Sequence, residues 1–172
     1  MKHKVSILIS SCDKFKDLWP IFSFYFEKNW LDCELNKYFL SNNEKSNIYG
    51  FKSINVGEDL SWSSNLRKAL DQIPTDYVLI MLEDFFIDKK VDNQKFNNIV
   101  NDFIDLNGNY LKFLTTPKSP FKSSSHYFNI LPPKTLYRST AVFALWKKST
   151  LLDLLNIDEN PWEFEDRASK RS

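Results

Sequence analysis

Short apolar runs alternate with amphipathic segments along the first half of the chain, and this alternation constrains the fold more than any other feature. Runs of strand length occupy residues 5–10, 37–42, 53–56 and 76–82. Amphipathic segments lie between the first and second runs and between the third and fourth. Strands that alternate with helices indicate an α/β domain with a largely parallel sheet. We therefore expect the chain to form one α/β domain over residues 1–172.

Local signals set the expected ends of the first two helices. The segment from about 18 to 30 has apolar residues at helical spacing, and Pro20 suits a first turn, so we expect that helix to begin there. Ser63 or Ser64 is expected to cap the second helix. That helix should end before Pro74, because the residue before a proline disfavours the helical conformation.

The second half of the chain is less regular. We expect a helix over 91–106, strands over 110–116 and 140–148, and a loop rich in proline and serine over 117–136. Ser149 is expected to cap a short helix that reaches Leu155. The final residues, DRASKRS (166–172), show no periodic pattern, and we expect no regular structure there.

Composition excludes several classes of function. The net charge of +1 provides no strong field for nucleic acid or anionic lipid. No apolar stretch is long enough to span a membrane, and the apolar run near the N-terminus is too short for a secretory signal. Two cysteines, Cys12 and Cys33, favour a reducing compartment, although a single disulfide stays open.

The stretch VLIMLEDFF (78–86) carries the strongest chemical signal. Five apolar residues lead directly into Glu83 and Asp84. Ligands of open α/β sheets bind at the carboxyl ends of the strands, so this pair should lie beside the ligand crevice. Adjacent carboxylates suit Mg²⁺ or Mn²⁺, which prefer oxygen ligands. The alternative is that one acid caps a turn and the other faces water.

Two weaker signals should lie at the same edge of the sheet, where the strands have their carboxyl ends. Ser10, Ser11 and Asp13 follow the first strand and could hold a ribose or a base, although serine and aspartate are also ordinary turn residues. Arg67 lies in the helix after the third strand and could contact a phosphate or a base. An exposed salt bridge is the alternative for Arg67.

The stretch NPWEFE (160–165) is the second dense signal. An aromatic residue beside acids is typical of a sugar site, where Trp162 would pack on a ring and Glu163 or Glu165 would take a hydroxyl proton. The alternative is a helix start at which Glu163 and Glu165 are first-turn acids.

Several other chemistries lack support. Only two histidines occur, so neither a zinc site nor a Cys/His or Ser/His pair is indicated, and Cys12 is not expected to be a nucleophile. There is no glycine-rich dinucleotide or P-loop motif. A metal-dependent phosphohydrolase with Asp13 as nucleophile would want an aspartate two positions later, and that position is Phe15.

Taken in order, four blocks resemble the GT-A glycosyltransferases, most of all the family-2-type enzymes of bacterial surface-polysaccharide biosynthesis. These blocks are VSILISSCDKF (5–15), GEDLSWSSNLRKAL (57–70), YVLIMLEDFF (77–86) and YRSTAVFALWKKSTLLDLL (137–155) leading to NPWEFE (160–165). The resemblance runs from about Lys4 to Glu165. It implies a three-layer, Rossmann-like sandwich with a mostly parallel central sheet.

The resemblance also implies a nucleotide diphosphate-sugar donor and assigns residues to it. Contacts to the nucleotide-sugar would come from Ser10, Ser11, Asp13, Asn42 or its neighbour Ser41, Arg67, Glu83 and Asp84. The family motif is usually Asp-x-Asp, whereas this chain has Glu83-Asp84 followed by two phenylalanines. Asp84 is the favoured ligand of Mn²⁺ or Mg²⁺, with Glu83 in support.

At the acceptor end, the resemblance implies an inverting displacement. Glu165 would be the catalytic base, with Glu163 as the alternative, and Trp162 would form a wall of the acceptor site. The acceptor would be a glycan or a lipid-linked saccharide. The expected location is the cytoplasm, with peripheral association at the inner face of the cell membrane also allowed.

Family members usually continue well beyond the WEFE block, whereas this chain ends seven residues after Glu165. We therefore expect the usual C-terminal extension to be missing, and part of the acceptor site with it. A nucleotide-sugar-binding remnant without catalysis is the main alternative to an active enzyme, and the phosphohydrolase is the weaker one.

Overall fold

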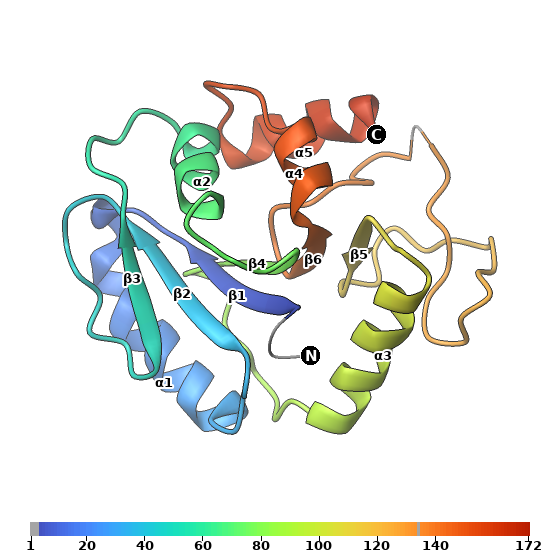
Figure 1. Ribbon diagram of the computed structural model, residues 1–172, viewed down its shortest axis with the longest axis horizontal. Helices are drawn as coiled ribbons and strands as arrows, with labels where there is room; N and C mark the ends of the chain where they lie inside the picture. Colours follow the sequence, from blue (N-terminus) through green and yellow to red (C-terminus); the bar gives the residue numbers. More distant parts are fainter. Residues whose placement is uncertain (1–3, 134) are drawn as a thin grey trace.

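A central six-stranded sheet lies between two layers of helices in the computed structural model, which describes residues 4–133 and 135–172 (Figure 1). The strand order is β3-β2-β1-β4-β6-β5. Only β6 runs antiparallel to its neighbours, so the expected α/β class with a mostly parallel sheet is confirmed. The strands are β1 (Val5–Ser10), β2 (Asn36–Ser41), β3 (Phe51–Asn55), β4 (Tyr77–Leu82), β5 (Tyr110–Lys112) and β6 (Ala144–Lys147).

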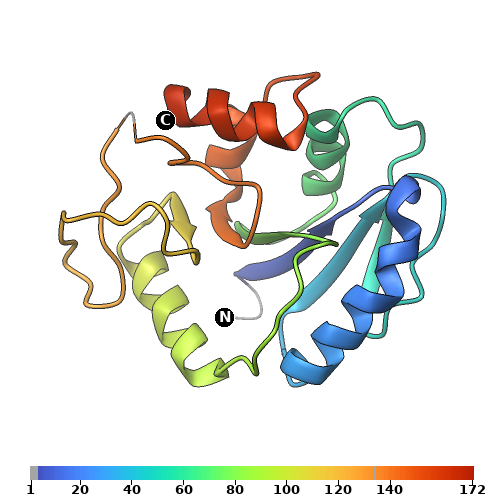
Figure 2. The ribbon, with the colours of Figure 1, turned by 180° about the vertical axis from the view of Figure 1, so that it is seen from behind.

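The helices form the two outer layers. α1 and α3 cover one face of the sheet, and α2, α4 and α5 cover the other (Figures 1 and 2). The three-layer arrangement expected from the resemblance is therefore present. The helices are α1 (Trp19–Trp30), α2 (Trp62–Leu70), α3 (Asn93–Asp105), α4 (Lys148–Leu154) and α5 (Pro161–Arg171), and a 3-10 turn, η1 (Asp13–Leu18), precedes α1.

Alternation along the strands divides the core into two clusters. Ile7 and Ile9 of β1 join the cluster under α1 and α3, whereas Leu8 joins the cluster under α2, α4 and α5. Successive side chains of a strand point to opposite faces, so a strand covered on both sides must be apolar throughout. The first cluster is rich in aromatic rings, including Phe22 and Trp30, and each such buried side chain contributes roughly 1.5–3 kcal/mol.

The residues that cap the N-terminal ends of α2 and α4 differ from those predicted. α2 is capped by Ser61, whose hydroxyl accepts a hydrogen bond from Ser64 N–H at 3.1 Å, so the prediction of Ser63 or Ser64 as the cap was wrong. α4 begins at Lys148 after an extended Lys147 and has no side-chain cap, so Ser149 does not cap it. The sequence predicted that α2 and α4 are helices, but it did not predict where they begin, because several neighbouring serines could serve as caps.

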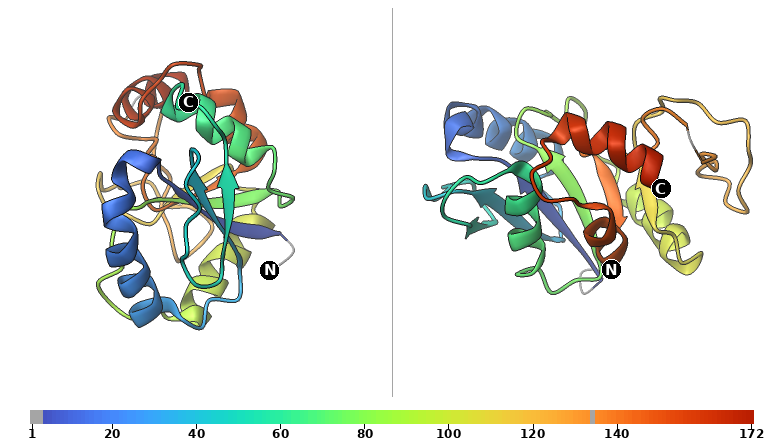
Figure 3. Two further views of the ribbon diagram at one scale, coloured as in Figure 1. Left: turned by 90° about the vertical axis from the view of Figure 1, so that its left-hand side faces the viewer. Right: turned by 90° about the horizontal axis from the view of Figure 1, so that it is seen from above.

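The two late strands are shorter than predicted. β5 ends at Lys112 rather than residue 116, and β6 begins at Ala144 rather than residue 140. Phe143 has a positive φ of 45°, which interrupts extended backbone directly before β6. Residues 113–133 and 135–143 form a long irregular segment that extends away from the sheet beyond β5 (Figure 3).

The C-terminal residues form a helix, which corrects the expectation of an irregular tail. α5 includes residues 166–171, and Ala168 and Ser169 are buried. Arg171 binds the buried Glu159 through two N–H groups at 2.8 Å. The helical character was missed because only one side of a short, highly charged segment is apolar.

Two further expectations concern the cysteines and the membrane. Cys12 and Cys33 are free thiols, so the option of a disulfide between them is closed. Within the described residues, the longest apolar helical segments fall short of what a membrane crossing requires.

Candidate functional site

A cavity of about 1000 Å³ lies where β1 and β4 end, bounded on its other sides by the 112–117 and 136–142 segments and the start of α5. Its lining brings together most of the residues singled out in the sequence. These are Ser10, Ser11, Glu83, Asp84, Trp162 and Glu165.

This position is the topological switch point of the sheet. From β1 the chain builds outward through β2 and β3, and it then returns to add β4 on the other side of β1. The loops after β1 and β4 therefore diverge and leave a crevice between them, which is where ligands bind in open α/β sheets. Figure 1 shows β1 and β4 as neighbours at the centre of the sheet.

Glu83 follows β4 and stays buried, with 6% of its surface exposed. Burial raises the pKa of Glu83 to about 7, and the negative charge of Asp84 adds to the effect. Hydrogen bonds from a backbone N–H and from the Ser11 hydroxyl act in the opposite direction. The apolar strand explains this state, because it carries the carboxyl group to the edge of the core instead of into water.

Asp84 is exposed, and it shares the cavity wall with Glu83. None of the ion pairs between described residues involves either acid. Those residues also contain no group of three or more acid, histidine or cysteine side chains that could enclose a metal. Two carboxylates open to a cavity fit Mg²⁺ or Mn²⁺ nonetheless, because these ions take one or two carboxylates and complete their shells with substrate phosphates and water.

The serines after β1 are held by tryptophans. Trp62 donates its indole N–H to the Ser10 hydroxyl at 3.0 Å, and Trp19 donates to the Ser11 hydroxyl at 2.9 Å. Both hydroxyls thus accept from a fixed donor. Their orientation is set by α2 and α1, which places two pre-oriented polar groups in the cavity wall.

Asp13 and Asn42 lie outside the cavity lining and bind each other's loops. The Asp13 carboxylate accepts backbone N–H groups from Asn42, Asn43 and Glu44 at 2.9–3.2 Å. The Asn42 side-chain oxygen accepts from Asp13 N–H at 3.1 Å. A carboxylate engaged by three donors is a poor nucleophile, so this geometry disfavours the phosphohydrolase alternative.

The structure places Arg67 away from the other predicted site residues. Its guanidinium donates to the carbonyl oxygens of Leu152 and Leu155 at 2.8 and 2.9 Å, at the C-terminal end of α4. A cation at a helix C-terminus satisfies carbonyl groups that lack partners in the helix. Arg67 is not among the residues that line the cavity.

Glu165 faces the cavity from the first turns of α5. One of its carboxylate oxygens accepts from the Thr140 hydroxyl and, at 3.0 Å, from the backbone N–H of Ala141. No hydrogen bond to the second oxygen forms within the described part of the chain, so that oxygen is free to take a proton. Burial and the charge of Glu165 together raise the pKa of the neighbouring Tyr110.

Glu163 has a structural role in this fold. It forms a capping box with Asn160, accepts from Arg167 at 3.1 Å, and does not line the cavity. Trp162 is 77% exposed, and its side chain stands at the cavity mouth. Of the two predicted candidates for the base, Glu165 is the one that the fold brings to the cavity.

Sequence reasoning missed several residues of the cavity wall. Asp59 accepts the Asn65 amide N–H at 2.6 Å, and the other amide atom, Asn65 Oδ1, is buried without a partner among the described residues. Thr140, in the irregular late segment, donates to Glu165, and Lys112, at the end of β5, interacts with Glu165 electrostatically. No local pattern in the sequence marks these four, because a loop, α2, β5 and the late segment meet only in the tertiary structure.

Cys12 also lines the cavity, and burial followed by the charges of Asp59 and Glu83 raises the pKa of its thiol. A thiol held protonated is a weak nucleophile. The environment of Cys12 therefore agrees with the expectation that it is not a catalytic nucleophile.

Comparison with known proteins adds one finding on the fold. No family model matches the chain, and no curated protein matches its sequence. The structure is similar to S. aureus TarS, a GT-A glycosyltransferase, with a TM-score of 0.54 and 13% sequence identity over 87% of this chain. The matched region is 29% of the TarS chain. At this identity the similarity shows a glycosyltransferase-like fold.

Proposed function

We propose that this chain is a glycosyltransferase domain that moves a sugar from a nucleotide diphosphate-sugar donor to a hydroxyl of a saccharide acceptor. The observation that carries the proposal is the cavity at the switch point, whose lining includes Glu83 and Asp84 together with Glu165. A transferase needs a site for a leaving diphosphate and a base for the incoming hydroxyl within one cavity, and these two groups supply both.

The donor end lies between the ends of β1 and β4. Asp84, supported by Glu83, would hold Mn²⁺ or Mg²⁺ together with the donor diphosphate, and the cation would offset the charge that builds on the departing phosphate. Ser10 and Ser11 offer fixed hydroxyl groups to the nucleoside. Asp13 and Asn42 support this end by fixing the loops after β1 and β2 to each other.

At the acceptor end, Glu165 would remove the proton from an acceptor hydroxyl. The hydroxyl oxygen forms a bond to the anomeric carbon on the face opposite the diphosphate. The bond from that carbon to the phosphate oxygen breaks, and its electron pair leaves with the diphosphate. The product would therefore have the inverted anomeric configuration. Thr140 and Ala141 keep the Glu165 carboxylate oriented for this step.

The finer assignment follows the family resemblance. We place the domain in bacterial surface-polysaccharide synthesis, on the cytoplasmic side of the membrane, with a glycan or lipid-linked saccharide as acceptor.

The first experiment is thermal unfolding of the purified chain with UDP, GDP, CDP and ADP, each with and without Mn²⁺. A nucleotide at 100 times its dissociation constant should add about 2.7 kcal/mol of stability. We expect one nucleotide to stabilise the protein in a Mn²⁺-dependent manner. Release of free sugar from the matching donor then separates an enzyme from a binding remnant.

The control compares two exposed acids that both follow β4. Asp84→Ala should abolish the Mn²⁺-dependent shift, whereas Asp88→Ala, outside the cavity lining, should leave it unchanged. If a folded chain shows no shift with any nucleotide, the donor site does not exist in this chain. If both variants retain the shift, the acids after β4 are not the metal ligands.

A further inference from the structure

We propose that a second cavity, next to the first, binds the acceptor, and that this acceptor is a negatively charged saccharide chain. The inference rests on the proposed function, because it assigns the acceptor of that reaction. The second cavity has a volume of about 1200 Å³ and is lined by α3, β5, the irregular 113–131 segment and α4. That volume exceeds the range of about 300–1,000 Å³ usual for small-molecule pockets, which favours an extended ligand.

The two cavities share part of their walls. Lys112, Leu114, Thr115 and Pro117 line both. Lys112 ends β5 and the other three follow it directly, so both cavities border this strand end. A saccharide chain longer than one unit can therefore place its terminal hydroxyl at Glu165 while its other units lie in the second cavity.

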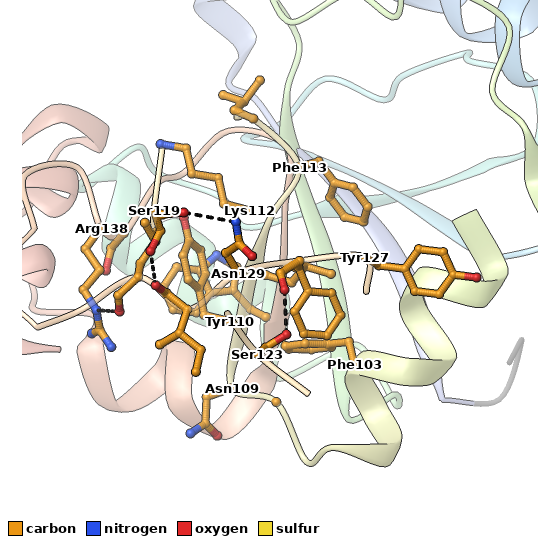
Figure 4. A pocket seen from close by; sticks show the side chains of 18 of the residues that line it. Phe103, Asn109, Tyr110, Lys112, Phe113, Ser119, Ser123, Tyr127, Asn129 and Arg138 are labelled. Carbon is orange, nitrogen blue, oxygen red and sulfur yellow. Dashed lines mark hydrogen bonds between the residues drawn. The ribbon is translucent and has the colours of Figure 1, made fainter. Parts of the chain in front are cut away.

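The walls of the second cavity combine aromatic rings with amide and hydroxyl groups. Figure 4 shows Phe103, Phe113 and Tyr127 grouped on one side and Asn129, Lys112 and Arg138 on the other. Apolar ring faces beside hydrogen-bonding groups suit saccharides, which have C–H faces and hydroxyl edges. The polar lining includes Asn109, Thr115, Ser119, Ser123, Ser124, Asn129 and Thr150.

The 113–131 segment is held in shape by its own hydrogen bonds. Ser123 donates to the Phe128 carbonyl at 2.6 Å, and Asn129 donates to the Ser119 carbonyl at 3.0 Å (Figure 4). The wall that carries the polar groups is thus pre-organised, which lowers the entropic cost of binding.

A buried donor in the same wall also points to a polar ligand. The indole N–H of Trp146 has no acceptor among the described residues, although the side chain is only 1% exposed. Its ring packs on Tyr110 with a centroid distance of 4.2 Å, and both residues line the cavity. Buried donors normally have partners, and a ligand hydroxyl could supply one here.

Charge distinguishes the two cavities. The described lining of the second cavity contains four basic side chains, Lys95, Lys112, Lys118 and Arg138, and one acid, Asp153. The described lining of the first cavity contains four acidic side chains, Asp59, Glu83, Asp84 and Glu165, and one cationic side chain, Lys112. Because the net charge of the whole chain is only +1, this separation is local. A surplus of cations around a saccharide-sized cavity fits carboxylate or phosphate groups on the ligand.

Lys112 lies where the two charge environments meet. Its ammonium donates to the Tyr137 carbonyl at 3.3 Å, and burial lowers its pKa while the charge of Glu165 opposes that change. The position is suited to an acidic group on the acceptor unit next to the reacting sugar.

The test measures saccharide binding without any nucleotide, by isothermal titration calorimetry. The phosphate probe is 6-phosphomannopentaose with neutral mannopentaose as its match, and the carboxylate probe is tetragalacturonate with neutral galactotetraose. We expect at least one charged probe to bind more tightly than its neutral match and to weaken as salt is raised. Which charged probe binds identifies phosphate or carboxylate as the recognised group.

Variants connect the binding to the cavity. Lys95→Gln and Lys118→Gln, both exposed and outside the first cavity, should each reduce affinity for the charged probe about two- to fivefold. Lys90→Gln, an exposed lysine outside both linings, is the matched control and should have no effect. Equal binding of charged and neutral probes, or equal loss in all three variants, would overturn the inference.

The outcome also separates this inference from the proposed function. Mn²⁺-dependent nucleotide binding without binding of either charged probe would refute the second cavity as an anionic acceptor site and leave the glycosyltransferase proposal standing. Charged-probe binding that depends on Lys95 and Lys118, without any nucleotide binding, would establish the saccharide site and refute the transferase.

Discussion

Replacing Glu83 by glutamine should make the protein more stable at high pH and leave it nearly unchanged at low pH. Glu83 is buried, and its pKa is raised from an ordinary value of 4.5 to about 7. The folded protein therefore binds this proton more tightly than the unfolded chain does. Stability from this group is complete below about pH 4.5 and is lost as the pH rises through about 7.

The magnitude follows from the same two values. Each pH unit between the unfolded and folded pKa corresponds to about 1.4 kcal/mol, so the interval from 4.5 to about 7 corresponds to about 3 kcal/mol of destabilisation at pH 8. Glutamine resembles the protonated acid in shape and remains uncharged. Glu83→Gln should thus unfold with a free energy about 3 kcal/mol above wild type at pH 8 and close to wild type at pH 4.5.

The assay is urea unfolding from pH 4.5 to 8, at constant ionic strength and with a chelator to remove divalent cations. The quantity of interest is the difference between variant and wild type, because other groups titrate in the same range. Asp88→Asn is the matched control, since this exposed carboxylate lies outside the cavity and should change the pH dependence far less. A pH-independent difference for Glu83→Gln, or a variant less stable at pH 8, would refute the reasoning.

The same pair of proteins tests the link to a metal. A divalent cation bound by both acids favours the ionised form of Glu83. Mn²⁺ should therefore stabilise wild type at pH 8 and stabilise Glu83→Gln much less. Equal stabilisation of both would show that Glu83 is not a ligand.

Three further predictions concern the partner of Glu165, the helix at the C-terminus and the turn between α3 and β5. Thr140→Val removes the hydroxyl that orients Glu165, so sugar release should fall about tenfold while the nucleotide-induced shift in melting temperature is unchanged. Arg171→Ala leaves Glu159 buried and without its two closest donors, so urea unfolding should show a loss of about 3 kcal/mol. Burial alone raises the pKa of Glu159, but Arg171 outweighs it and holds that pKa below its usual value, so the loss should shrink as the pH is lowered and the carboxylate is protonated. Gly108→Ala would place the new Cβ 2.0 Å from a ring atom of the buried Phe103. This overpacking should lower the free energy of unfolding by about 1–3 kcal/mol in the same assay.

The first half of the fold could be read from the sequence because its signals are local and redundant. The strands predicted over 5–10 and 76–82 from their largely apolar residues are present at 5–10 and 77–82. The helix around Pro20 begins at Trp19, one residue before the expected start. A strand buried on both faces has to be apolar along its length, so composition alone identifies it.

The second half of the chain has weaker local signals. The strand predicted over 140–148 is only Ala144–Lys147, and the tail predicted to be irregular is helical through Arg171. The two errors have different origins. The strand is shorter because the positive φ of Phe143 interrupts extended backbone directly before Ala144, although the preceding residues are apolar. The tail is a short segment with few apolar residues and takes its conformation from tertiary contacts, such as the bond between Arg171 and Glu159, which lie twelve positions apart.

The sequence by itself determined the α/β class and the placement of two acids at the end of the most apolar strand, because apolar patterning shows which strands are buried. The tertiary structure alone decided which polar residues meet. It brought Glu165 to the cavity, turned Glu163 to the cap of α5, and engaged Arg67 with the carbonyl groups of α4. Periodicity specifies which face of an element is buried, whereas the partner of a polar side chain depends on how separate elements pack. That packing involves segments far apart in the chain, which no local pattern describes.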